Sequence, residues 1–271
     1  MRYVLKRPDL ILLVTLIFLS GRACVLAYAE EGPDYVRERQ IMVDSQVAAR
    51  GINDKKILGV VGRIERHRFV PEGMRGYAYD DISLPMGENE AVPPAYFVSL
   101  VAQLSELKGA EKVLELGIES GYQAAVLAEL SKEVYCVEPS EELALQSEQR
   151  LKALGYKNIK VKTGNIESGW PEFAPYDVIV ITNPIDFAPQ QAVDQLMVNG
   201  RIVMPLREYW GKKLIVLTKV KKSSGYGMIA TLVTPVIGET PSEKAPQESP
   251  PDKKEGSKWE SVNGSKWMKR R

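Results

Sequence analysis

Residues 113–122 read Val-Leu-Glu-Leu-Gly-Ile-Glu-Ser-Gly-Tyr. The apolar run that ends at Leu116 predicts a buried strand, and the pattern after Gly121 predicts a helix. The two glycines, Gly117 and Gly121, allow a tight turn between them, in which free backbone N–H groups at the helix start favour an anionic ligand. Glu119 stands midway between the glycines, where such loops usually have no side chain. The stretch therefore predicts a nucleotide-binding loop that carries one unusual anion.

The sequence around this loop alternates between segments of strand length and segments with helical spacing. The alternation predicts a mostly parallel sheet with helices on both faces, closed by a hairpin. The expected strands are Lys112–Leu116, Glu133–Val137, Ile159–Thr163, Asp177–Thr182 and Arg201–Pro205; the expected helices are Tyr122–Leu130, Glu141–Leu154 and Ala188–Leu196; the expected hairpin joins Lys213–Lys221 to Gly227–Pro235.

The segment before the sheet is predicted to be mainly helical. Apolar residues recur at helical spacing in Asp34–Arg50, Asn53–Arg66 and Pro94–Leu107. We therefore divide the chain into a leader, a helical substrate-side region, a sheet and a tail. Their predicted bounds are 1–29, 30–109, 110–237 and 238–271.

The leader has the layout of a secretory signal. Residues 2–7 are rich in Lys and Arg, the apolar run Leu10–Leu19 follows, and Ala27-Tyr28-Ala29 supplies small residues for cleavage. The apolar run has roughly half of the ~20 residues that a membrane span needs. We therefore expect an exported, periplasmic protein, and the alternative is an inner-membrane anchor through residues 10–26.

The tail differs in composition from the rest of the chain. It is rich in Pro, Glu, Lys and Ser, so it cannot bury enough apolar surface to offset the entropy of ordering, and we expect it to be disordered. Gly-Ser-Lys-Trp occurs in it twice, ending at Trp259 and Trp267. These tryptophans can anchor a partner or a surface. The alternative is a low-complexity tail with a chance duplication.

Composition and charge limit the classes of function. Hydrophobic residues make up 44% of the chain, which predicts a globular core, and the formal net charge of +1 gives no argument for nucleic-acid binding. After the leader, the cysteine that remains is Cys136, interpreted as a buried small hydrophobe in a strand. No metal-ligand cluster is evident. We expect a monomer without a nucleic-acid partner or a metal.

Glu138, the acid that ends the second predicted strand, suggests a ligand site that includes the glycine loop. In an open parallel sheet, ligands bind beyond the carboxyl ends of the strands. Glu138 is placed there to accept hydrogen bonds from ribose hydroxyls. The amide of Asn165, after the third strand, can read an adenine edge, although Gly164-Asn165 is also a common turn sequence. The pattern predicts an adenosine-containing ligand.

Further motifs point to a known family. They are QVAARGIND at 46–54, RHRFVP at 66–71, AYDD at 78–81, LPMG at 84–87, SGYQAAVLAEL at 120–130, GWPE at 169–172 and APYD at 174–177. On these motifs the chain resembles the protein-L-isoaspartate O-methyltransferase family over about residues 40–237. The resemblance implies a Rossmann-like class I S-adenosylmethionine-dependent methyltransferase, an α/β fold. Its seven-stranded sheet is mostly parallel with the last strand antiparallel, and a helical extension precedes it.

The resemblance also implies an activity and a set of site residues. The activity is methyl transfer from S-adenosylmethionine to the free carboxyl of isoaspartyl residues in proteins or peptides, which is a repair reaction. No catalytic residue is assigned. The implied cofactor-binding residues are Glu115, Gly117, Ile118, Glu119, Gly121, Glu138, Asn165 and Ile166.

The chain departs from the family pattern at functional positions. Where the family has Gln-Thr-Ile-Ser-Gln-Pro, residues 90–95 read Glu-Ala-Val-Pro-Pro-Ala, so Ala91 and Pro93 replace the two hydroxyls that hold the isoaspartyl group. Glu119 replaces the middle glycine of the loop, and Asn165 replaces the adenine-binding Asp. These changes and the leader keep a second hypothesis open, a catalytically inactive binding or scaffold module in the cell envelope. A third hypothesis is a methyltransferase that retains the cofactor site but acts on a different methyl acceptor.

Two other features have structural interpretations. His67 is the only histidine and precedes Phe69-Val70-Pro71, so we interpret it as part of the framework rather than as a general base. Thr182-Asn183-Pro184 follows the fourth strand and is interpreted as turn chemistry.

Overall fold

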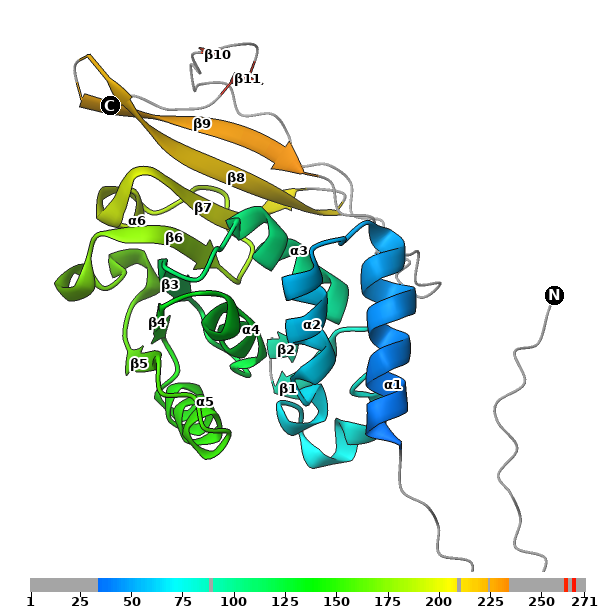
Figure 1. Cartoon of the computed structure of the whole chain (residues 1–271). Helices are drawn as coiled ribbons and strands as arrows, with labels where there is room; N and C mark the ends of the chain where they lie inside the picture. The colour runs from blue at the N-terminus through cyan, green and yellow to red at the C-terminus, as the bar shows by residue number, and fades with distance from the viewer. Residues whose placement is uncertain are drawn as a thin grey trace, which may run out of the picture. The chain divides into compact units, whose positions relative to one another are not determined.

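The structure is a computed structural model that describes residues 34–87, 90–208, 211–223, 225–233, 261–262 and 265–266 (Figure 1). The chain divides into two units after Pro235. The first unit contains the helical region and the sheet, in the order that the sequence predicts. The expected leader, the alternative anchor at 10–26 and the two tail tryptophans, Trp259 and Trp267, lie outside the described residues.

Within the described residues, seven strands form one sheet in the order β5-β4-β3-β6-β7-β8-β9. β3 pairs in parallel with β4 and β6, β4 with β5, and β6 with β7. β3 is therefore central, and the loop after it lies where the strand order reverses, at the switch point of the sheet. The strands are β3 (Lys112–Leu116), β4 (Glu133–Glu138), β5 (Ile159–Thr163), β6 (Tyr176–Ile181), β7 (Leu196–Glu208), β8 (Gly211–Lys222) and β9 (Gly225–Val233).

The reversed strand of the sheet is β8, and this corrects the expected order. β8 pairs antiparallel with β7 and with β9, so β9 again points the same way as β3. The expectation that the last strand would be the reversed one is wrong. Connections of about two residues join β7 to β8 and β8 to β9, and such short loops connect only antiparallel neighbours.

Helices cover both faces of the sheet, because alternate side chains of each strand point to opposite faces. Val113 of β3 packs in the cluster that includes α3 and α4, whereas Leu114 packs in the cluster that includes α6. Figure 1 shows α4 and α5 on one side of the central strands and α6 on the other. The α-helices are α1 (Tyr35–Ile41), α2 (Lys55–Arg63), α3 (Ala95–Ser105), α4 (Tyr122–Leu130), α5 (Glu141–Ala153) and α6 (Gln190–Gln195).

Side-chain caps fix where several helices begin. Asp34 accepts a hydrogen bond from the N–H of Arg37 at α1, and Asp54 accepts one from the N–H of Lys56 at α2. Ser140 caps α5 in the same way. These caps satisfy N–H groups that the first turn of a helix leaves without partners. Short helical segments of other types are the π-helix η1 (Met42–Val47) and the 3-10 turns η2 (Ala48–Arg50), η3 (Arg66–Arg68), η4 (Glu72–Tyr77), η5 (Ile166–Ser168) and η6 (Pro171–Phe173).

The helical region also contains a short hairpin that the sequence prediction missed. β1 (Leu84–Gly87) pairs antiparallel with β2 (Glu90–Val92), and Leu84 and Val92 are fully buried. Strands of three or four residues carry too little periodicity to be recognised. The hairpin matters because β2 carries Ala91 and leads directly into Pro93.

The tail contains secondary structure where none was expected. β10 (Ser261–Val262) and β11 (Ser265–Lys266) form an antiparallel pair. The expected disorder of the rest of the tail concerns residues outside the described part of the chain. Among the described residues, none of the helices has the length and apolar character needed to cross a membrane.

Candidate functional site

The glycine turn after β3 adopts a backbone that its two glycines make possible. Gly117 has φ +95° and Gly121 has φ +81°, both in the left-handed region. A Cβ added at Gly117 would lie 3.5 Å from Thr182 and Asn183, and one at Gly121 would lie 3.3 Å from Leu151. Both positions therefore favour glycine for conformation, and at Gly121 the space for a side chain is also tight. The turn has the shape that the sequence predicted.

Glu119 occupies a glycine conformation with a side chain. Its φ of +47° lies in the left-handed region, which costs a non-glycine residue about 1–2 kcal/mol. The loop is held in this conformation from α5, because the Ser147 hydroxyl donates to the Glu119 carbonyl and Arg150 Nη1 donates to the Ser120 carbonyl at 2.8 Å. Glu119 is only 9% exposed. The loop therefore accommodates the acid without losing its turn.

Glu138 faces the glycine turn from the end of β4. Its Oε2 accepts hydrogen bonds from the N–H groups of Ile118, at 3.0 Å, and Glu119, at 3.3 Å, while Oε1 accepts from the N–H of Ser140 at 3.1 Å. An ionised carboxylate has about four acceptor positions. The bonds from the described residues therefore leave one position, and binding of both hydroxyls of a ribose would require that a loop N–H release the carboxylate. The structure brings Ile118, Glu119 and Glu138 together, as the sequence predicted.

Glu115 lies inside the molecule rather than on the wall of the turn. It is 0% exposed, and its carboxyl accepts hydrogen bonds from Gln123 Nε2, at 3.1 Å, and from the Cys136 thiol, at 3.5 Å. Burial raises the pKa of Glu115 to about 8, and the charges of Glu119 and Glu138 act in the same direction. The group therefore carries a proton at neutral pH. This buried placement gives no evidence for the predicted direct contact of Glu115 with a cofactor. Glu115 instead packs beneath the turn.

Thr182 ties the end of β6 to the glycine turn. Its hydroxyl donates to the Gly117 carbonyl at 2.7 Å and accepts from Gln123 Nε2 at 3.3 Å. Oε1 of Gln123 is buried without a hydrogen-bond partner among the described residues. The turn interpretation of Thr182-Asn183-Pro184 omitted this contact. The sequence carried no signal for it, because the contact depends on β3 and β6 being neighbours.

Asn165 and Ile166 follow β5 and have different surroundings. Asn165 is exposed, and its side-chain oxygen accepts the N–H of Glu167 at 2.8 Å, which makes it the cap of η5. This is the turn role that the sequence left open. Ile166 is half-buried and lies at an apolar cavity. Its predicted place beside a ligand site is consistent with this geometry, while a base-reading role for Asn165 stays a prediction.

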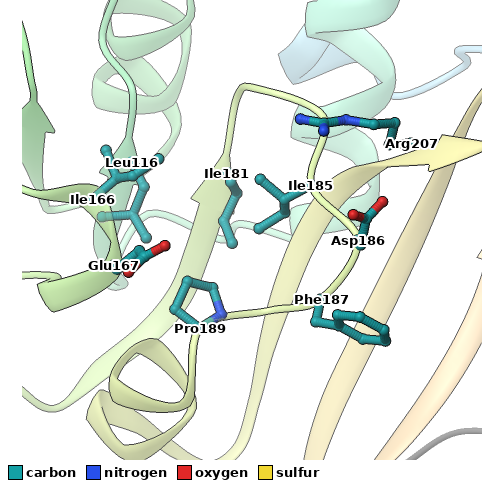
Figure 2. Close-up of a pocket in the computed structure, with 9 residues that line it drawn as sticks. All are labelled: Leu116, Ile166, Glu167, Ile181, Ile185, Asp186, Phe187, Pro189 and Arg207. Atoms are coloured by element: carbon teal, nitrogen blue, oxygen red, sulfur yellow. The ribbon is translucent and has the colours of Figure 1, made fainter. Parts of the chain in front are cut away.

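This cavity lies at the carboxyl ends of β3 and β6, on the face that α6 covers. Its volume is about 260 Å³. Figure 2 shows Leu116 and Ile166 close together on one side of it, with Ile181 and Pro189 facing them. Ile185, Phe187 and three charged side chains, Glu167, Asp186 and Arg207, complete the lining. An apolar hollow with charged groups at its edge suits a flat aromatic ring that carries polar substituents.

The hairpin β1–β2 is anchored by a buried guanidinium. Arg66 is 0% exposed, and its Nη2 donates to the Pro93 carbonyl at 2.8 Å, while Nη1 donates to the Ala78 carbonyl. Its guanidinium also lies over the Tyr122 ring, 5.5 Å from the centroid, at the start of α4. Arg66 thus connects the segment that carries Pro93 with the helix after the glycine turn. The sequence prediction missed this role, because an arginine in Arg66-His67-Arg68 is indistinguishable from a solvent-exposed one.

His67 has partners within the helical region. Its ring stacks on Tyr35 with centroids 4.0 Å apart, and Nδ1 lies 2.8 Å from the Tyr79 hydroxyl. Burial lowers the pKa of His67. These contacts come from α1 and from the turn after η4, and they support the structural interpretation of this histidine.

Comparison with solved structures defines the class of protein. One similar structure is a protein-L-isoaspartate O-methyltransferase, with a TM-score of 0.61 and 25% identity; the match covers 75% of this chain and 65% of that chain. Another is a putative protein-L-isoaspartate O-methyltransferase from Plasmodium falciparum in complex with S-adenosyl-L-homocysteine. It has a TM-score of 0.62 and 20% identity over 73% of this chain and 95% of its own, and it supports the fold alone. The fold is that of the class I S-adenosylmethionine-dependent methyltransferases.

Comparison of sequences places the chain within this class. The family described as protein-L-isoaspartate(D-aspartate) O-methyltransferase matches residues 37–237. Protein-L-isoaspartate O-methyltransferase 2 of Geotalea uraniireducens is 42% identical over 181 residues, 67% of this chain and 83% of the relative. A second relative, protein-L-isoaspartate O-methyltransferase 2 of Shewanella sediminis, is 38% identical over 212 residues, which are 78% of this chain and 87% of the relative. The chain belongs to the protein-L-isoaspartate O-methyltransferase family.

The residues around the glycine turn fit the cofactor of this family, S-adenosylmethionine. The glycines at 117 and 121 keep side chains away from the turn, Glu138 offers a carboxylate for hydroxyl groups, and the apolar cavity with Ile166 lies at the end of the same strand, β3. Glu119 is the exception, since it adds bulk and negative charge where the family pattern has neither. The assignment of individual cofactor contacts to these residues is a proposal.

Proposed function

We propose that the protein is an S-adenosylmethionine-dependent methyltransferase that esterifies the free carboxyl of isoaspartyl residues in proteins or peptides. The observation that carries the proposal is the glycine turn facing Glu138, in a chain that belongs to this family. The relatives named protein-L-isoaspartate O-methyltransferase support the same activity. Ile118, Glu119, Glu138 and Ile166 are the proposed cofactor contacts, with Gly117 and Gly121 shaping the turn.

The proposed reaction needs little acid–base catalysis by the protein. When bound, S-adenosylmethionine supplies an electrophilic methyl group on a sulfonium, which the acceptor carboxylate takes up as a methyl ester while S-adenosylhomocysteine leaves as a neutral thioether. An isoaspartyl carboxyl is already ionised at neutral pH. The protein therefore needs to bind and orient two reactants, and misplacement by about 1 Å can cost roughly 100-fold in rate.

The acceptor side is where this chain has lost groups. Ala91 and Pro93 supply no hydroxyl, and the Pro93 carbonyl is engaged by Arg66. Loss of a hydrogen bond to a charged group costs on the order of 1–3 kcal/mol. We expect the wild-type protein to bind S-adenosylmethionine and to methylate isoaspartyl peptides slowly.

Calorimetric titration and a transfer assay with labelled donor test this proposal. The matched variant carries Ala91→Thr, Pro93→Ser and Glu119→Gly, which restore the family residues. We expect it to transfer methyl groups at least about tenfold faster than the wild type, because each restored hydroxyl contributes of the order of 1 kcal/mol. A folded wild type that binds no donor at millimolar concentration would favour the inactive-module hypothesis. A variant that binds donor but methylates no isoaspartyl peptide would point to a different acceptor.

The location and the tail complete the proposal. We propose that residues 1–29 direct export to the periplasm, that Trp259 and Trp267 contact a partner or surface, and that the protein is a monomer. The support is the sequence pattern alone. N-terminal sequencing of the protein from the periplasmic fraction tests export, because a start after Ala29 is expected and an intact Met1 in the membrane fraction would favour the anchor.

A further inference from the structure

Arg66 is a buried cation that is held by main-chain carbonyls rather than by a salt bridge. It is 0% exposed, and it takes part in none of the ion pairs among the described residues. Its Nη1 donates to the Ala78 carbonyl, and its Nη2 donates to the carbonyls of Pro93, at 2.8 Å, and Val92, at 3.4 Å. Packing alone does not explain a charge at this place, because an apolar side chain of similar size can be buried at a lower cost.

The guanidinium of Arg66 also reaches the helix that follows the glycine turn. It lies over the ring of Tyr122, the first residue of α4, at 5.5 Å from the centroid. The N–H of Tyr122 donates to Ser120 Oγ, at 3.2 Å, within the turn itself. Nε of Arg66 and the Tyr122 hydroxyl are both buried without a hydrogen-bond partner among the described residues, and unpaired buried polar atoms lower stability. The pair therefore costs stability that apolar residues would not, which points to a positional role.

The acceptor segment, residues 91–93, depends on Arg66 for its anchoring. The segment contains Ala91 and Pro93, the two positions at which the family pattern has its acceptor-holding hydroxyls. The β1–β2 ladder ends at Val92, and Pro93 and Pro94 have no N–H with which to continue it. Arg66 donates to the carbonyls of Val92 and Pro93, where the ladder stops. The place of this segment is therefore set largely by the guanidinium.

The cofactor turn, by contrast, has anchors that do not involve Arg66. The Thr182 hydroxyl donates to the Gly117 carbonyl at 2.7 Å, and Arg150 Nη1 donates to the Ser120 carbonyl at 2.8 Å. These side chains come from the residue after β6 and from α5, on the far side of the turn from the hairpin in sequence. A change at Arg66 therefore leaves these anchors of the turn in place but removes hydrogen bonds from the acceptor segment.

We propose that Arg66 is a positioning residue that sets the place of the acceptor segment relative to the cofactor turn, so that the carboxylate of an isoaspartyl peptide reaches the methyl donor. The inference rests on the proposed function. Arg66 is fully buried and touches neither reactant, so it acts through the carbonyls of Val92 and Pro93 and through the ring of Tyr122. Since methyl transfer depends on orientation, a displacement of about 1 Å can cost roughly 100-fold in rate.

The test compares acceptor binding, cofactor binding and stability in the purified protein. The measurements are calorimetric titration with an isoaspartyl peptide, separate titration with S-adenosylhomocysteine, kcat with labelled donor, and Tm. Arg66→Lys keeps the charge but loses the fork that bridges the Ala78 and Pro93 carbonyls. Tyr122→Leu leaves the hydrogen bonds of Arg66 and removes the ring beneath it. Arg68→Lys is the matched control, because Arg68 lies on the same 3-10 turn with 48% of its side chain exposed.

We expect Arg66→Lys to weaken peptide binding at least about fivefold and to lower kcat at least about tenfold, while the Kd of S-adenosylhomocysteine stays within about twofold of the wild-type value. Tyr122→Leu should change peptide binding and kcat in the same direction by a smaller factor. Arg68→Lys should keep the wild-type values of all four quantities.

Two results would overturn the inference. A lower Tm in Arg66→Lys with unchanged peptide Kd and kcat, measured well below Tm, would show that the residue serves stability alone. Equal losses of affinity for the peptide and for S-adenosylhomocysteine would show that the turn, rather than the acceptor segment, depends on Arg66. If Arg66→Lys does not fold, Tyr122→Leu decides by the same criteria. Binding of neither ligand to the folded wild type would instead overturn the proposed function on which the inference rests.

Discussion

Glu115 is a carboxyl group that the fold buries completely between β3 and α4. Burial raises its pKa from 4.5 to about 8, although hydrogen bonds from Gln123 and Cys136 act the other way. The folded protein therefore keeps a proton that the unfolded chain releases near pH 4.5. Because the folded state binds more protons in this window, the group's contribution to stability is fully present below about pH 4.5 and falls as the pH rises towards 8.

Glu115→Gln should remove this pH dependence, because the amide is neutral at every pH and similar in size. We expect the free energy of unfolding of the wild type, relative to the variant, to fall by up to about 1.4 kcal/mol per pH unit between pH 5 and pH 8. Urea unfolding at several pH values measures it. Glu72→Gln, at an exposed position, is the control and should follow the wild type. Parallel curves for the wild type and Glu115→Gln would contradict the assigned protonation.

Residues of the site differ in how far the sequence could predict them. Gly117, Gly121 and Glu138 follow from a local pattern, because a glycine turn after a strand and an acid at the next strand end have few other uses. Arg66 and Thr182 do not, since their partners lie 27 and 65 residues away in the chain. Glu115 was expected to face the ligand, but the alternation of side chains along β3 turns it into the core.

At the scale of elements, Lys219 of β8 holds the end of α6. Its ammonium is buried and donates to the carbonyls of Val193, at 2.8 Å, and Leu196, at 2.7 Å. These carbonyls belong to the last turn of α6 and to the residue after it, where a helix leaves carbonyl groups without partners. The end of the short helix α6 therefore depends on a side chain from β8, a strand that comes later in the chain.

Lys219→Met should destabilise the protein by about 1–3 kcal/mol, because it keeps the apolar stem and leaves buried carbonyls unpaired. Lys221→Met is the control on the same face of the same strand, since Lys221 is exposed and the change should cost less than about 0.5 kcal/mol. Chemical denaturation of both variants measures the difference. Equal stability of the two variants would show that water replaces the ammonium without cost.

At the scale of the whole molecule, the fold and the tail are expected to be separable. The family match ends at residue 237, and the first compact unit ends at Pro235. Deletion of residues 238–271 should therefore leave Tm within about 1 °C of the wild-type value. Deletion of residues 225–271, which also removes β9 and exposes the buried side chains of β8, should lower Tm by about 10 °C or more. Thermal unfolding of the three proteins is the measurement, and a large loss of Tm in the shorter deletion would show that the tail supports the fold.

The sequence by itself determined the α/β class, the family and the position of the glycine turn after β3. Strands β3 and β5 and helix α4 begin and end at the predicted residues, because hydrophobic periodicity and the flanking glycines are local properties of the chain. The strands from β5 to β7 are parallel, as the alternation of strands and helices in the sequence predicts.

Only the tertiary structure decided which residues that are distant in sequence come into contact. The short hairpin β1–β2 forms because Leu84 and Val92 are buried and Arg66 binds the carbonyls beside it, and no local pattern reveals this. The reversal at β8 and the burial of Glu115 are likewise results of packing. Such contacts join residues that are distant in sequence, and their energies depend on burial, which a chain acquires only when it folds.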